Sequence, residues 1–161
     1  MFIPEETYKK IIDYIPITCI DFFIIHENSI LLWKRKNEPA KWVWFVPWWR
    51  ILKAEIQKEA QKRKLLEETW INIEENISIN INLLGVYDTI FDRNAFSDNQ
   101  LTHTINVTYV VELIEKSIEI STDDQNEILK WFDMETDYYI FHPYIKNLID
   151  DYKKTKKIKN I

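Results

Sequence analysis

Charged side chains recur on one face of a helix that the sequence predicts over residues 56–69. Glu59, Arg63 and Glu67 are spaced four residues apart and therefore share that face, while Glu68 lies one helical step further round. Such a pattern is most often a solvated surface with ion pairs. Carboxylate oxygens are also ligands that Mg²⁺ prefers, and a bound Mg²⁺ neutralises charge that develops on a departing diphosphate. The helix therefore offers either a salt-bridged surface or one side of a metal site.

The segment before this helix favours the metal site. Residues 44–46 predict a brief strand that Pro47 ends, and a loop then leads into the helix. A strand, loop and helix in this order place backbone carbonyl oxygens near residues 48–49 opposite the carboxylates of Glu67 and Glu68. Carbonyl and carboxylate oxygens together suit a hard cation such as Mg²⁺.

The remaining segments alternate between helical and strand-like patterns. Runs of β-branched and aromatic residues predict strands over residues 17–25, 30–34, 77–91, 103–114 and 128–132. Further helices are predicted over residues 7–14 and 141–153. This alternation indicates the α/β class, and we expect an α/β sandwich built on a mixed β-sheet.

The composition excludes several classes of protein. Hydrophobic residues make up 46% of the 161-residue chain and aromatic residues 14%, which excludes disorder and suits one domain over residues 1–161. No run of about 18 apolar residues is present, so we expect no membrane partner. The net charge of −5 argues against nucleic acid. The lone Cys19 and the lack of a signal-peptide pattern indicate a cytoplasmic protein. We expect the basic tail from about residue 153 to fray.

Two motifs outside the helix make the pattern specific. Residues 34–40 read Lys-Arg-Lys-Asn-Glu-Pro-Ala, and residues 44–47 read Trp-Phe-Val-Pro. The loop and helix also carry four residues at the spacing of a Nudix box, namely Glu55, Arg63, Glu67 and Glu68. In these motifs, and over nearly its whole length, the chain resembles the GDP-mannose mannosyl hydrolase branch of the Nudix superfamily. The resemblance implies a Nudix-type α/β/α sandwich and a homodimer. It also implies hydrolysis of a GDP-sugar to GDP and free sugar by attack of water at the anomeric carbon.

The same resemblance implies roles for individual residues. Mg²⁺ would be held by Glu68, Glu67, Gln125 and the main-chain carbonyl of Trp48. Arg35 would stabilise the leaving diphosphate, because a planar guanidinium pairs with two phosphate oxygens and stays charged. Asp21 and Arg50 would line the same pocket, and Lys64 stands where most Nudix boxes have a glutamate.

The chain departs from that branch at the general base. The branch has a histidine directly after the metal-binding glutamine, whereas this chain has Asn126, whose neutral carboxamide orients water but cannot accept a proton at neutral pH. Three substitutes are open: Glu127, His103 or a metal-bound hydroxide. His103 is retained as a candidate substrate-binding residue, although a strand-end histidine without a catalytic role is the simpler interpretation.

Two other functions remain open. One is a Nudix pyrophosphatase that cuts a P–O bond of an NDP-sugar or nucleotide, because Glu67 and Glu68 are both present and the branch's histidine is absent. The other is a nucleotide-sugar-binding protein without catalysis, which Asn126 and the bulky Trp48 and Trp49 favour.

Tryptophan stands at five positions where the resembled branch usually has glycine, and the chain holds one glycine and seven tryptophans. The five positions are Trp33, Trp42, Trp48, Trp49 and Trp70. One hypothesis is that UGA codons, which some bacterial lineages read as glycine, were translated as tryptophan. The alternative is that the tryptophans are genuine, in which case Trp49 and Trp70 should strain the metal loop.

Overall fold

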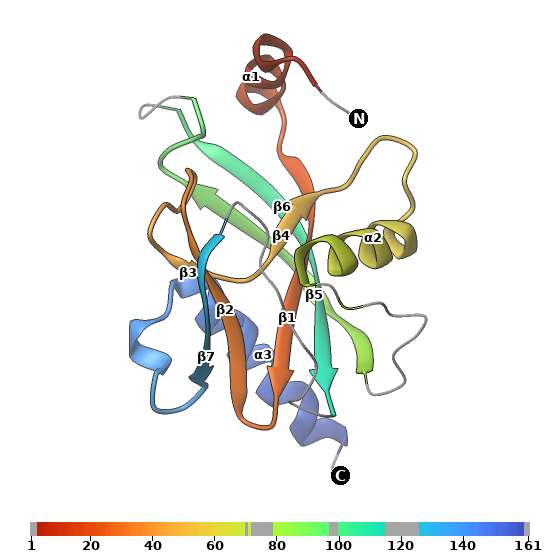
Figure 1. The fold of residues 1–161 in the computed structure, drawn as a ribbon, viewed down its shortest axis with the longest axis vertical. Coiled ribbons are helices and arrows are strands. Elements are labelled where there is room, and N and C mark those ends of the chain that lie inside the picture. The colour runs from red at the N-terminus through yellow and green to blue at the C-terminus, as the bar shows by residue number, and fades with distance from the viewer. Residues whose placement is uncertain (1–2, 70, 72–78, 97–99, 115–125, 160–161) are drawn as a thin grey trace.

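A computed structural model describes residues 3–69, 71, 79–96, 100–114 and 126–159 (Figure 1). Its elements in chain order are α1 (Glu5–Tyr14), β1 (Ile17–His26), β2 (Ser29–Arg35), β3 (Trp44–Phe45), β4 (Trp48–Arg50), α2 (Gln57–Thr69), β5 (Ile79–Phe91), β6 (Thr102–Leu113), β7 (Asn126–Asp133), the 3₁₀ turn η1 (Tyr138–Ile140) and α3 (Pro143–Lys159). Within these residues, no helix combines the length and the apolar character that crossing a bilayer requires.

The strands form one mixed sheet in the order β3-β2-β1-β6-β5, with β4 added to β1 and β7 added to β2. β1 and β6 run parallel, and the other pairs are antiparallel. β2 pairs with β1 only near the turn that joins them, where Ile25 lies opposite Ile30. Nearer the start of β1, β4 takes the place of β2 and sets Cys19 opposite Arg50. β1 and β2 therefore diverge away from their turn, and β4 occupies the edge of β1 that β2 leaves.

Alternate residues of β1 face opposite sides of the sheet because side chains alternate along a strand. Phe23 and Ile25 belong to a buried cluster with the inward residues of α3, whereas Ile20, Phe22 and Ile24 pack in a second cluster with Ala60 and Leu65 of α2. In Figure 1, α2 lies in front of the sheet and α3 behind it. The predicted α/β/α sandwich on a mixed sheet is confirmed.

Two local features differ from the expectations drawn from the sequence. Residues 48–50 were expected in a loop, but they form β4, which is held by pairing with residues 19–21 of β1. The last helix was expected to end at Lys153, but α3 continues to Lys159. The described part of the basic segment is therefore helical.

Candidate active site

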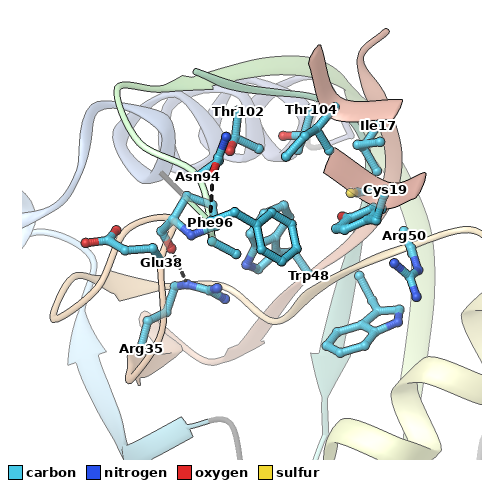
Figure 2. Close-up of a pocket in the computed structure, with 15 residues that line it drawn as sticks. Ile17, Cys19, Arg35, Glu38, Trp48, Arg50, Asn94, Phe96, Thr102 and Thr104 are labelled. Atoms are coloured by element: carbon cyan, nitrogen blue, oxygen red, sulfur yellow. Dashed lines mark hydrogen bonds between the residues drawn. The ribbon is translucent and has the colours of Figure 1, made fainter. Parts of the chain in front are cut away.

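A cavity of about 290 Å³ opens where β1, β4 and β6 meet the N-terminal helix α1 (Figure 2). Two guanidinium groups line it, Arg35 from the end of β2 and Arg50 from β4. Aromatic rings supply much of the remaining wall, from Tyr8 of α1, Trp48 of β4 and Phe96 of the segment between β5 and β6. The cavity thus combines cationic groups with apolar faces, which suits a ligand that carries both phosphates and rings.

Both arginines are held in place by neighbouring groups. Arg35 Nε donates to the carbonyl oxygen of Pro39 at 2.8 Å, and its guanidinium carbon lies 4.9 Å from the ring centroid of Trp48. The guanidinium carbon of Arg50 lies 4.9 Å from the ring centroid of Tyr8. Stacking on an aromatic face leaves the edge of a guanidinium group available to an anion. The two arginines are therefore arranged for phosphate oxygens.

Three buried polar atoms belong to residues that line the cavity and lack hydrogen-bond partners among the described residues. They are Trp48 Nε1, Arg50 Nε and Thr104 Oγ1, and each is shielded from solvent. Buried polar atoms are nearly always hydrogen-bonded, so atoms such as these mark places where a ligand or ordered water completes the site. Cys19 also lines the cavity, and burial raises the pKa of its thiol well above the usual value, so the thiol is neutral.

Asp21 belongs to β1, two residues beyond Cys19, and is not among the residues that line the cavity. Its side chain is 0% exposed, and Tyr144 of α3 donates its hydroxyl to Asp21 Oδ2 at 2.5 Å. Burial raises the pKa of Asp21 to about 8, although the Tyr144 hydrogen bond and the charge of Arg35 oppose the shift. In the β1–β4 ladder Asp21 lies directly opposite Trp48, which lines the cavity.

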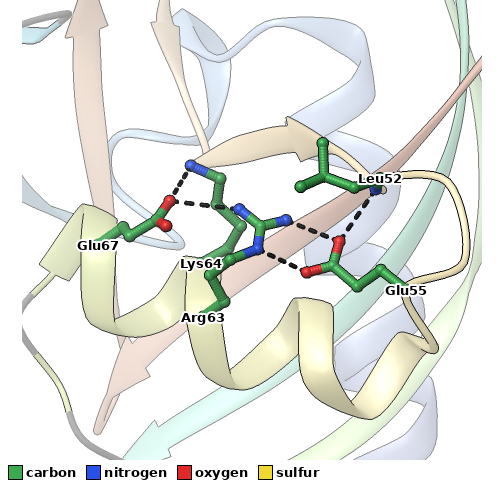
Figure 3. A network of polar contacts seen from close by, with 5 residues as sticks. All are labelled: Leu52, Glu55, Arg63, Lys64 and Glu67. Carbon is green, nitrogen blue, oxygen red and sulfur yellow. Dashed lines mark hydrogen bonds and ion pairs between the residues drawn. The ribbon is translucent and has the colours of Figure 1, made fainter. Parts of the chain in front are cut away.

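A network of ion pairs holds the loop before α2 against the helix (Figure 3). Arg63 donates to both carboxylate oxygens of Glu55, from Nε at 2.5 Å and from Nη2 at 2.7 Å. The backbone N–H of Leu52 also donates to Glu55, at 2.9 Å. The hydrogen bond from Arg63 is the main reason that the pKa of Glu55 is lowered. These two box residues therefore fix the shape of the loop.

Glu67 is engaged by two cations of its own helix. Lys64 Nζ lies 2.5 Å from Glu67 Oε2, and Arg63 Nη1 lies 3.3 Å from the same oxygen. The Lys64 ammonium also lies 3.9 Å from the ring centroid of Trp49 in β4. Lys64 is only 4% exposed, so this cation is enclosed between the helix and the strand.

The described residues include no group of three or more His, Cys, Asp or Glu side chains that could hold a metal ion. Glu55 and Glu67, the two box carboxylates whose side chains are described, are both neutralised by Arg63 and Lys64. By themselves these side chains do not make a Mg²⁺ site. Gln125 lies outside the described residues, and for Glu68 only the backbone is described.

Two other predicted site residues, His103 and Asn126, belong to β6 and β7. His103 Nε2 lies 2.9 Å from Asp88 Oδ1, and its side chain is absent from the lining of the cavity. Asn126 begins β7, where its backbone pairs with Arg35. The start of β7 therefore lies beside the cationic end of β2, while the side chain of Asn126 is outside the described set.

Three of the five doubtful tryptophans show features that suit glycine better. Trp42 has a φ of 65°, in the left-handed region that favours glycine. The indole nitrogens of Trp33 and Trp48 are buried without hydrogen-bond partners among the described residues. A glycine would remove the φ penalty at the first position and the orphaned N–H groups at the other two. Trp70 lies outside the described residues.

Comparison with known proteins assigns the family. The NUDIX domain model matches residues 18–147, so the chain belongs to the Nudix hydrolase family, whose members act on nucleotide derivatives. It is 29% identical over 148 residues to the low-salt glycan biosynthesis protein Agl8 of Haloferax volcanii, a match that covers 92% of this chain and 89% of Agl8. It is 30% identical over 133 residues to an ADP-ribose pyrophosphatase of Methanocaldococcus jannaschii, covering 82% of this chain and 71% of that protein.

Solved structures confirm the fold. The Ap4A hydrolase of C. elegans, in a binary complex, superposes with a TM-score of 0.65 at 14% identity, covering 88% of this chain and 98% of that one. The NUDIX domain model confirms the predicted membership of the Nudix superfamily.

Several cavity residues were not foreseen from the sequence. Tyr8, Phe96 and Thr104 come from three distant segments, and no local motif connects them. Tyr8 lies in a predicted helix, where an aromatic residue most simply indicates packing. Thr104 reaches the cavity because β6 pairs with β1, where Thr104 lies opposite Ile17. Such a long-range pairing leaves no local signal in the sequence.

Proposed function

We propose that this protein hydrolyses a GDP-sugar of the GDP-mannose type to GDP and free sugar, by attack of water at the anomeric carbon. The observation that carries the proposal is the pair of arginines, Arg35 and Arg50, which line one cavity together with aromatic rings. A diphosphate bridging a nucleoside and a sugar needs cationic donors at its centre and apolar surfaces at its ends. The relative named for glycan biosynthesis supports a sugar-linked substrate.

The residues of this chain divide the work as follows. Arg35 and Arg50 bind the diphosphate and stabilise the negative charge that grows as the glycosidic C–O bond breaks. Tyr8, Trp48 and Phe96 enclose the ligand and limit the access of bulk water. Asp21 is a buried acid next to Cys19 and Trp48 of the site, and it accepts a hydrogen bond from the hydroxyl of Tyr144. Asn126, at the start of β7 beside Arg35, orients the attacking water.

Mg²⁺ is the proposed cofactor, and it would supply a further positive charge on the diphosphate. Its proposed ligands are Glu68, Gln125 and the main-chain carbonyl of Trp48, with Glu67 as the fourth candidate. His103 remains a candidate for the substrate, although its contact with Asp88 lies away from the cavity. A cytoplasmic homodimer completes the proposal, without nucleic acid or membrane as partners.

Two alternatives have specific support. Cleavage of a P–O bond is supported by the relative named as an ADP-ribose pyrophosphatase and by the intact pair Glu67 and Glu68. Binding without turnover is supported by Asn126 in place of a general base and by Trp48, whose ring takes up space beside Arg35.

Hydrolysis in ¹⁸O-labelled water separates the three functions. The protein is incubated with Mg²⁺ and GDP-mannose, and in parallel with ADP-ribose, and the products are analysed by mass spectrometry. Label in the free sugar supports C–O cleavage, whereas label in a phosphate product supports the pyrophosphatase. Calorimetric binding of GDP-mannose with no product formed supports the binding protein. Variants at Lys41, an exposed residue outside the cavity, serve as controls for purification and folding.

A further inference from the structure

We propose that three side chains on neighbouring strands, Arg50, Thr104 and Asn106, form a subsite that binds the sugar of the substrate through its hydroxyl groups. This inference rests on the proposed function, because it assigns one part of the GDP-sugar to one part of the same cavity. The chemistry recognised is that of a polyol attached to a diphosphate.

The three residues share one face of the sheet, at one side of the cavity. Cys19 of β1 lies opposite Arg50 in β4 and opposite Asn106 in β6, so these residues form a row across three strands. Thr104 precedes Asn106 by two residues in β6, and its side chain is therefore on the same face. Arg50, Cys19 and Thr104 line the cavity, and Asn106 adjoins them without lining it. Figure 2 shows the three lining residues on the side away from Arg35.

Each residue of the subsite has one polar atom that is shielded from solvent and lacks a hydrogen-bond partner within the described part of the chain. The atoms are Arg50 Nε, Thr104 Oγ1 and Asn106 Oδ1. Thr104 is 1% exposed and Asn106 is 0% exposed. The other end of the Asn106 carboxamide is engaged, because Nδ2 donates to Thr89 Oγ1 at 2.8 Å. Buried polar atoms are nearly always paired, so these three indicate a ligand that completes them.

The types of these atoms favour hydroxyl groups over phosphate. Arg50 Nε only donates, Asn106 Oδ1 only accepts, and the Thr104 hydroxyl does both. Ionised phosphate oxygens are acceptors and would leave Asn106 Oδ1 unpaired. A sugar hydroxyl donates and accepts, so the hydroxyl groups of one sugar ring can satisfy all three atoms. Asp21 Oδ1, also buried and without a partner among the described residues, is a further acceptor two residues along β1 from Cys19.

Arg50 connects this subsite with the diphosphate. A guanidinium group carries five N–H donors, so the Nη groups of Arg50 remain for phosphate oxygens while Nε serves the subsite. In a GDP-sugar the sugar is attached directly to the diphosphate, and one guanidinium group can therefore contact both. Arg35, on the other side of the cavity, then contacts the diphosphate alone. None of the residues in the subsite is one of the five doubtful tryptophans.

Calorimetric titrations of the full chain with GDP and with GDP-mannose test the subsite, in EDTA so that GDP-mannose is not hydrolysed. The ratio of the two dissociation constants isolates the contribution of the sugar. We expect Thr104→Val, which removes the hydroxyl and keeps the shape, to weaken GDP-mannose about fivefold and to leave GDP unchanged. Thr104→Ser keeps the hydroxyl and should keep the wild-type ratio, whereas Asn106→Leu should lower it.

Thr102→Val is the matched control. Thr102 lines the same cavity from the same strand, but its hydroxyl already donates to the carbonyl oxygen of Arg93 at 3.0 Å. The same chemical change at this position removes no free hydroxyl from the cavity. The ratio of the two dissociation constants should therefore stay as in the wild type.

The outcomes distinguish this inference from the proposed function. Equal weakening of GDP and GDP-mannose by Thr104→Val would overturn the subsite, since these atoms would then hold the nucleotide. An unchanged ratio, or an equal fall in Thr102→Val, would overturn it too. If Thr104→Val fails to fold, as judged by circular dichroism, Asn106→Leu decides by the same ratio.

Turnover of the wild type with Mg²⁺ is measured separately. A loss confined to GDP-mannose in a protein that forms no product would support the subsite and contradict the hydrolase. Product formation together with an unchanged ratio in Thr104→Val would support the hydrolase and overturn the subsite.

Discussion

Arg63 holds both carboxylate oxygens of Glu55, at 2.5 and 2.7 Å, across the loop that connects β4 to α2. The two residues are eight positions apart in the chain, and a helix alone would not bring them together. Glu55 also accepts the backbone N–H of Leu52, which closes the loop on itself. The eight-residue spacing of Glu55 and Arg63 in the Nudix box thus has a structural reason. It lets this ion pair close the loop before α2 against the helix.

Replacing Arg63 with lysine should loosen that loop although the charge is kept. A lysine ammonium cannot form two parallel hydrogen bonds to one carboxylate as a guanidinium does. We expect a loss of about 2 kcal/mol in the free energy of unfolding, the scale of hydrogen bonds to charged groups. Urea titration followed by circular dichroism measures it. Arg93→Lys is the control, because Arg93 is an exposed residue, and it should change stability by less than about 0.5 kcal/mol. Equal effects of the two changes would contradict the role given to Arg63.

The sequence predicted the box, the helices and most strands, because these depend on local patterns of residues. β-branched runs such as residues 17–25 have few alternatives to a buried strand. β4 was missed because its three residues become a strand only by pairing with residues 19–21 of β1, a long-range contact that no local pattern shows.

Asp21 shows a second limit of sequence reasoning. Its place in an apolar strand indicated an inward-facing acid but could not separate core from pocket. The difference depends on Trp48, which lies opposite Asp21 in the β1–β4 ladder, and on Tyr144, which is 123 residues further along the chain. Lys64 pairs with Glu67, three residues along α2, and its expected pairing with Glu68 involves a side chain outside the described set.

Asp21→Asn should change how stability depends on pH. The pKa of Asp21 is raised by burial from 3.8 to about 8 in the folded protein. A raised pKa means that the folded state favours the protonated acid. Its contribution to stability is therefore complete below about pH 4 and is lost as the pH rises to about 8. The neutral asparagine has no such dependence.

Thermal unfolding of both proteins between pH 5 and 9 tests this expectation. The melting temperature of Asp21→Asn minus that of the wild type should rise with pH and level off above about pH 8. Asp13→Asn, at an exposed position of α1, should run parallel to the wild type. A constant difference for Asp21→Asn across the range would show that the carboxyl group does not titrate there.

Arg35→Ala should lower turnover far more than Arg35→Lys. Alanine removes the charge that stabilises the departing diphosphate, and losses of roughly 10²–10³-fold in kcat are typical when one such donor is removed. Lysine keeps the charge and loses the planar stack on Trp48, so we expect an intermediate loss. Steady-state kinetics with GDP-mannose measure both variants, and Lys41→Ala should behave as the wild type. Normal kcat in Arg35→Ala would place the diphosphate elsewhere.

Trp42→Gly should stabilise the protein, which is unusual for removal of a tryptophan. Trp42 has a φ of 65° and is 54% exposed, so glycine relieves the backbone while little buried surface is lost. The expected gain is about 1 kcal/mol in the free energy of unfolding, the lower end of the cost of this conformation for a residue with a side chain. Trp44→Gly is the matched control, because Trp44 lies in β3 with its ring centroid 4.8 Å from that of Phe132. That change should destabilise the protein by about 3 kcal/mol.

A variant with glycine at all five positions tests whether those tryptophan codons are read as glycine in the protein's own host. If glycine is the natural residue, replacing all of Trp33, Trp42, Trp48, Trp49 and Trp70 together should raise stability, because strain and orphaned indole N–H groups disappear at once. If the tryptophans are genuine, the loss of the buried Trp33 ring, which is 1% exposed, should dominate and lower stability by several kcal/mol, roughly 3–5. Mass spectrometry of the protein made in its own host gives the direct answer. Tryptophan found intact at position 42 would overturn the glycine hypothesis, and it would make the left-handed backbone there a strain that the surrounding loop maintains.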